Sequence, residues 1–147
     1  MDGVEYEYED RNDYQQKIIN EKEFSIESII NICSSNLNGK YKKMPWKHPE
    51  LINGTGILES EESLNSYIAA YGEMHMVKCR AVLQNFPIDL INGTIEIVDW
   101  GCGQGIGSLC AIEKLKDHNL FNWIKRITLI EPSKFALNRA TINITKA

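Results

Sequence analysis

The stretch Ile95-Glu96-Ile97-Val98-Asp99-Trp100-Gly101-Cys102-Gly103-Gln104-Gly105 decides the fold of this chain. It opens with β-branched residues and ends in alternate glycines, which is typical of a short buried strand that runs into a tight turn. Residues 106–118 then have the apolar spacing of a helix, and residues 126–131 form a second short apolar run. We therefore expect an α/β fold built on a βαβ unit, with two parallel strands joined by a helix.

Helices are expected on both sides of this unit. Apolar residues at helical intervals predict one helix from Ser25 and a longer one over 63–84 with Ser63 as its N-cap, while Pro132-Ser133 opens a last helix through about residue 140. Gly72 lies inside the long helix at a cost of roughly 1 kcal/mol relative to alanine, which predicts a close approach by another group, either backbone or ligand. We divide the chain into an acidic arm and helical or loop extension (1–62) and the front half of an α/β domain (63–147).

Composition narrows the class of protein. The chain has 147 residues, of which 43% are hydrophobic and 24% charged, so we expect one ordinary globular core. A net charge of -4 provides no general attraction to nucleic acids or anionic membranes. The four cysteines form no C-x-x-C pair, so we expect a reduced, cytoplasmic protein, and no apolar run approaches the roughly 18 to 20 residues that span a bilayer.

Residues 40–49 are predicted to form a loop, because they contain two prolines and show no apolar periodicity. Four lysines alternate there with Tyr41 and Trp46, a combination with which single-stranded nucleic acids are bound. The more conservative interpretation is a solvated loop whose Trp46 packs on the core. Both interpretations stay open, as they do for the acidic residues 1–13, which form either a solvated arm or a partner-binding one.

The glycine loop and the acidic residues at the two strand ends are the candidate ligand-binding residues. Gly101, Gly103 and Gly105 allow the backbone to wrap closely around a ligand, although glycines alone are weak evidence. Asp99 precedes the loop, where a carboxylate can hold it and attract a cationic amine. Glu131 ends the second strand, where a carboxylate can accept hydrogen bonds from both hydroxyls of a ribose. Together these residues predict a nucleoside cofactor site.

At these residues the chain resembles the class I S-adenosylmethionine-dependent methyltransferases, whose first motif is an apolar strand followed by Asp-x-Gly-x-Gly-x-Gly and whose second is an acidic residue closing the next strand. The resemblance covers roughly residues 63–145 and implies a Rossmann-like fold. It implies that Gly101, Gly103 and Gly105 line the methionine part of the cofactor, that Asp99 positions its amino group and that Glu131 binds the ribose. Gln104, between two of these glycines, is counted among the cofactor-binding residues as well. The activity implied is methyl transfer to an unidentified nucleic acid, protein or small molecule.

Two other interpretations of the glycine loop, a dinucleotide-binding motif and a phosphate-binding loop, fit the sequence less well. The dinucleotide pattern Gly-x-Gly-x-x-Gly requires a third glycine where the chain has Ile106 or Ser108, and a phosphate-binding loop requires a lysine after Gly107. No spacing of cysteines, histidines and carboxylates predicts a metal site, and the catalytic residues are not identified. Tyr67, Tyr71 and His75 share one helical face, which more often packs in a core than carries a catalytic base.

The family continues through further strands, whereas this chain has two. We therefore expect either the truncated front half of a longer enzyme or a sheet completed by self-association, since two parallel strands make a poor independent sheet with exposed edges. The alternative function is a non-catalytic binding or scaffolding module that keeps part of the methyltransferase fold.

Overall fold

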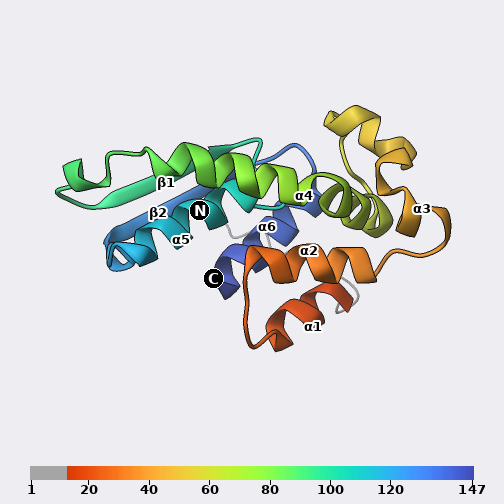
Figure 1. The fold of residues 1–147 in the computed structure, drawn as a ribbon, viewed down its shortest axis with the longest axis horizontal. Helices are drawn as coiled ribbons and strands as arrows, with labels where there is room; N and C mark the ends of the chain where they lie inside the picture. The colour runs from red at the N-terminus through yellow and green to blue at the C-terminus, as the bar shows by residue number, and fades with distance from the viewer. Residues whose placement is uncertain (1–12) are drawn as a thin grey trace, which may run out of the picture.

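The computed structural model describes residues 13–147, so the acidic segment 1–12 lies outside the described residues. This part of the chain is a mixed α/β structure that is mostly helical around a two-stranded parallel sheet (Figure 1). The longer elements are α1 (Asp13–Asn20), α2 (Ile26–Ser35), α4 (Glu61–Gln84), β1 (Ile95–Trp100), α5 (Ile106–Asp117), β2 (Ile124–Ile130) and α6 (Lys134–Lys146). The short helical turns are α3 (Gly39–Lys43), η1 (Pro45–Lys47), η2 (Pro49–Gly54), η3 (Ile88–Leu90) and η4 (Phe121–Trp123).

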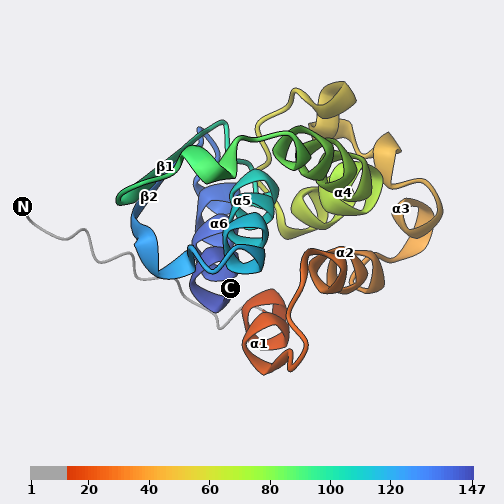
Figure 2. The ribbon, with the colours of Figure 1, turned by 60° about the vertical axis from the view of Figure 1, so that its left-hand side comes forward.

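The predicted βαβ unit is confirmed as β1, α5 and β2. The two strands are parallel, with Ile97 opposite Ile127 and Trp100 opposite Ile130. Figure 2 shows α5 and α6 together on one side of the strands. Strand β1 was expected to be buried, and this is wrong for the face of the strand that points away from α5 and α6. Val98 is 53% exposed and Trp100 78% exposed there, because no helix of residues 13–147 covers that face.

Helix α4 begins at Glu61, two residues before the predicted start at 63. Its N-cap is Ser60 and not Ser63: the Ser60 hydroxyl accepts a hydrogen bond from the Ser63 amide (3.1 Å) and the Ser63 hydroxyl accepts one from the Ser60 amide (3.2 Å). This reciprocal capping box satisfies two amides that the first turn would leave unpaired. The close approach predicted at Gly72 is confirmed, but the group is a side chain and not backbone or ligand, since a Cβ there would lie 3.1 Å from the Ile30 side chain on α2.

The extension and the βαβ unit share one core. Helix α1, which the sequence analysis did not predict, buries Tyr14 and Ile18 in a cluster that also contains Ile29, Ile68 and Leu109. Helices on both sides of residue 62 therefore stabilise each other by burying a common apolar surface. The division of the chain at residue 62 stays a prediction from the sequence.

Arg139 crosses this core as a buried charge. Its side chain is 1% exposed, its guanidinium lies 3.8 Å from the ring centroid of Tyr14, and it donates to Asn65 Oδ1 (2.9 Å) and Gln104 Oε1 (3.2 Å). It also forms an ion pair with Glu61. One side chain of α6 thus connects α1, the start of α4 and the glycine loop.

Two other expectations need correction. Residues 40–49 are not an irregular loop, because α3, η1 and the start of η2 give them helical turns, in which Pro45 and Pro49 occupy first-turn positions that proline tolerates. The last helix extends to Lys146 and not to about residue 140, since Ala140 and Asn143 are buried and hold its second half in place. Within residues 13–147, no helix is long and apolar enough to cross a membrane.

Candidate ligand-binding site

The glycine loop follows β1 directly and turns the chain into α5. Gly101, Gly103 and Gly105 have φ values of +66°, +53° and +89°, a region that side chains other than glycine rarely adopt. A Cβ on Gly105 would lie 3.4 Å from Ala140, so this glycine lets α5 and α6 pack closely. A Cβ on Gly101 or Gly103 would meet no heavy atom within 4 Å, so these two glycines border open space.

Glu131 lies beside this loop, as the order of strands predicted. Its Oε2 accepts a hydrogen bond from the Gly103 amide (3.0 Å) and its Oε1 accepts one from the Ser133 amide (2.9 Å). The Ile130 carbonyl accepts from the Gly101 amide (2.7 Å), which joins the end of β2 to the first turn of the loop. The loop after one strand and the carboxylate after the next therefore form one structural unit.

Asp99 is placed behind the loop and holds the start of α5. Its Oδ2 accepts hydrogen bonds from the Ser108 amide (3.1 Å) and the Ser108 hydroxyl (2.7 Å). A carboxylate at this position satisfies an unpaired amide of the first turn and lies at the positive end of the helix dipole. The predicted function of holding the loop agrees with this geometry, whereas the contact with a cofactor amine stays a prediction.

Gln104 is a buried anchor of the loop. Its amide nitrogen donates to the Leu64 carbonyl (2.9 Å), its side-chain oxygen accepts from Arg139, and its main-chain oxygen accepts from Asn143 Nδ2 (3.0 Å). These bonds tie the loop to α4 and α6. The Gln104 side chain is thus held by hydrogen bonds to Leu64 and Arg139, and its assignment to the cofactor stays a prediction.

A cavity of about 250 Å³ opens between the loop and the segment before α4. Gly101, Gly103, Gln104 and Glu131 line one side, and Tyr67 with residues 54–58 lines the other. The predicted site residues thus meet at one cavity, except that Asp99 and Gly105 are not among its lining residues.

The second wall, residues 54–58, was not predicted from the sequence, where the glycines at 54 and 56 indicate only a turn. Gly56 packs so closely that a Cβ would lie 1.8 Å from the Glu50 carbonyl oxygen. That close contact places residues 54–58 against the cavity.

Tyr67, Tyr71 and His75 form an aromatic group on one side of α4, and Tyr67 of this group lines the cavity. The rings of Tyr67 and Tyr71 meet edge to face with centroids 5.3 Å apart, and those of Tyr67 and His75 are stacked at 5.8 Å. All three side chains are half-buried. The predicted common face is confirmed, and it borders a cavity as well as the core.

No protein-family model, curated protein or solved structure matches this chain.

Cys102 lies within the loop but is a poor candidate for a nucleophile. Burial, and then the negative charges of Asp99 and Glu131, raise the pKa of the Cys102 thiol to about 11. The thiol is therefore protonated at neutral pH, and the thiolate is the reactive form. Within residues 13–147, no three histidine, cysteine or acidic side chains are grouped so that they could hold a metal ion.

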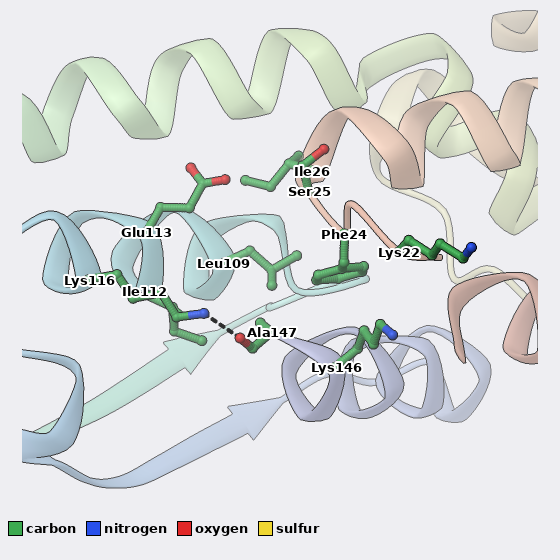
Figure 3. A pocket seen from close by; sticks show the side chains of 10 residues that line it. All are labelled: Lys22, Phe24, Ser25, Ile26, Leu109, Ile112, Glu113, Lys116, Lys146 and Ala147. Carbon is green, nitrogen blue, oxygen red and sulfur yellow. Dashed lines mark hydrogen bonds between the residues drawn. The ribbon is translucent and has the colours of Figure 1, made fainter. Parts of the chain in front are cut away.

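A second cavity, of about 360 Å³, lies between the start of α2, α5 and the end of α6 (Figure 3). Its charged groups are largely engaged: Lys116 donates to the Ala147 main-chain oxygen, Lys146 donates to the Ile19 carbonyl (2.9 Å), and Glu113 pairs with Arg80 (3.0 Å). These groups stabilise the helices that surround the cavity. It therefore offers a weaker candidate site than the loop does.

The lysine-rich segment 40–47 is a separate surface. Trp46 is 54% exposed, so the conservative interpretation, in which this ring packs on the core, is wrong for Trp46. The four lysines are exposed as well, and Lys40 lies over the Tyr41 ring at 4.8 Å. A nucleic-acid contact here stays a prediction.

Proposed function

We propose that this chain carries the S-adenosylmethionine-binding part of a Rossmann-like class I methyltransferase. The observation that carries the proposal is the cavity at which the glycine loop after β1 meets the carboxylate after β2. In open α/β sheets, ligands bind outside the carboxyl ends of parallel strands.

The hydrogen bonds of the loop favour a cofactor without phosphate groups. The amides of Gly101 and Cys102 donate to the Ile130 carbonyl, and the Gly103 amide donates to Glu131. Phosphate sites use such loop amides and the helix N-terminus to bind the anion, but here the helix start is already occupied by Asp99. A pyrophosphate in the cavity would meet the Glu131 carboxylate, while the loop amides of Gly101, Cys102 and Gly103 already have acceptors, which argues against a dinucleotide.

The residues present fit S-adenosylmethionine. Gly101 and Gly103 leave open space where a side chain would project, and Glu131 supplies two oxygens for ribose hydroxyls. A cavity of about 250 Å³ is smaller than the roughly 300 to 1,000 Å³ of pockets that enclose a whole ligand, so it would surround part of the cofactor. When bound, this cofactor supplies an activated methyl group; the residues of the chain orient it toward an acceptor, a gain that comes from proximity.

Replacing Glu131 by Ala tests the assignment, with Glu73→Ala as the control because Glu73 is an exposed residue of α4. Hydrogen bonds to a charged group contribute roughly 1.5 to 3 kcal/mol, so Glu131→Ala should weaken binding of S-adenosylhomocysteine by about 10-fold or more. Equal affinity of the two variants in calorimetric titration would contradict the site.

A second candidate function is a binding or scaffolding module. The exposed Val98 and Trp100 on the uncovered face of β1 favour it, because large apolar groups on a sheet face mark interaction surfaces. The module would self-associate through this face or the open strand edges. Concentration-dependent dimerisation in sedimentation experiments, abolished by Trp100→Ser, would support it, whereas a monomer at all concentrations would contradict it.

A further inference from the structure

Tyr67 connects the cavity to a histidine that does not reach it. The Tyr67 side chain lines the cavity beside Gly103 and Glu131, and its hydroxyl oxygen lies 3.2 Å from Nε2 of His75. The ring of Tyr71 contacts both partners edge-on, with centroids 5.3 Å and 6.5 Å away. Tyr67 and His75 therefore hold a fixed relative position two helical turns apart.

The charges around the pair favour a neutral histidine and a protonated phenol. Burial, and then the positive charge of Lys78, lower the pKa of His75. Burial, and then the charge of Glu131 across the cavity and the neighbouring Tyr71, raise the pKa of Tyr67. At neutral pH the Tyr67 hydroxyl can donate its hydrogen to Nε2 of the neutral imidazole, which leaves the lone pairs of the phenol oxygen free to accept a hydrogen bond.

We propose that Tyr67 accepts the proton that a methyl acceptor loses at this cavity, while the phenolic proton of Tyr67 passes to Nε2 of His75. The inference rests on the proposed function. Tyr67 is the catalytic residue, and His75 acts through it as the positioning residue and final proton holder.

The step balances in protons and charge. S-adenosylmethionine, when bound, supplies a methyl group without bonding electrons, so the acceptor atom forms the new bond to carbon with its own lone pair while sulfur keeps the pair of the broken bond. The acceptor's bond to hydrogen breaks, a new O–H bond forms on Tyr67, and the old O–H bond gives its proton to His75. The positive charge lost at sulfur appears on the imidazolium, and solvent later removes that proton.

The proposal requires His75 to sense the positive charge of the cofactor, which NMR titration of the His75 ring measures without any acceptor. We expect its pKa to be about 0.4 to 1.5 units lower with S-adenosylmethionine bound than with neutral S-adenosylhomocysteine, by Coulomb repulsion over a separation taken as roughly 8 Å at an effective dielectric constant between about 20 and 80. By linkage, protonation of His75 should lower the affinity for S-adenosylmethionine, relative to that for S-adenosylhomocysteine, by the same roughly 3- to 30-fold.

Two variants separate this coupling from packing. Tyr67→Phe removes the hydroxyl that donates to Nε2 and favours the neutral imidazole, so the pKa of His75 should rise, whereas Tyr71→Phe keeps its ring contacts and should leave that pKa unchanged. Binding of both ligands with the same His75 pKa in each would overturn this inference and leave the proposed function intact. Binding of neither ligand would overturn the proposed function itself.

Discussion

Replacing the buried Arg139 should destabilise the whole fold and loosen the glycine loop. In an Arg139→Met variant, Asn65 Oδ1 and Gln104 Oε1 lose their guanidinium donors at 2.9 and 3.2 Å, and both residues are buried. Each orphaned acceptor costs about 1 to 3 kcal/mol, and the lost contact with the Tyr14 ring costs about 1 kcal/mol more. The variant also avoids the free-energy cost of removing the Arg139 charge from water on folding, which offsets part of this loss. We expect the free energy of unfolding to fall by about 3 kcal/mol.

Urea unfolding followed by circular dichroism measures this loss, with Arg126→Met as the matched control. Arg126 also pairs with a glutamate, Glu96 at 2.8 Å, but at the surface, where such pairs contribute about 0 to 1 kcal/mol. A loss in Arg139→Met as small as that in Arg126→Met would refute the argument that this buried cluster connects the extension to the loop.

Three further predictions concern the loop and the core. Gly103→Val should cost about 1 to 2 kcal/mol of stability at its φ of +53° and should block the cavity in ligand titrations, whereas Gly93→Val, in open space without positive φ, should do neither. Asp99→Ala should cost about 1 kcal/mol in urea unfolding by removing the acceptor of the Ser108 amide, and no loss would contradict the capping function. Burial raises the pKa of the Cys33 thiol from near 9 to about 11, so the unfolded chain loses this proton first. Stability should therefore fall between about pH 9 and pH 11, and a Cys33→Ala variant with the same pH dependence would contradict this.

The βαβ unit could be predicted from the sequence because its signals are local. Strand β1, the glycine turn and α5 follow within about two dozen residues, and each has a pattern set by its own neighbours. Helix α1 could not be predicted in this way, since Tyr14 and Ile18 are its sole buried apolar residues and one such pair is too short a pattern. Its stability comes from packing against the core.

The site could be predicted in part for the same reason. The glycines and Glu131 are adjacent to strand ends, so the topology alone brings them together. The wall formed by residues 54–58 depends on the contact between Gly56 and Glu50, and the anchoring of Gln104 depends on Arg139, 35 residues away. Neither contact produces a periodicity in the sequence from which it could be predicted.

Calorimetric titration of the 147-residue chain with S-adenosylmethionine, S-adenosylhomocysteine and NAD measures whether the cavity at the glycine loop is an S-adenosylmethionine site. We expect the first two ligands to bind at one site and NAD not to bind, because the loop amides are engaged and two carboxylates lie beside them. Binding of NAD, or of none of the three ligands, would contradict that expectation.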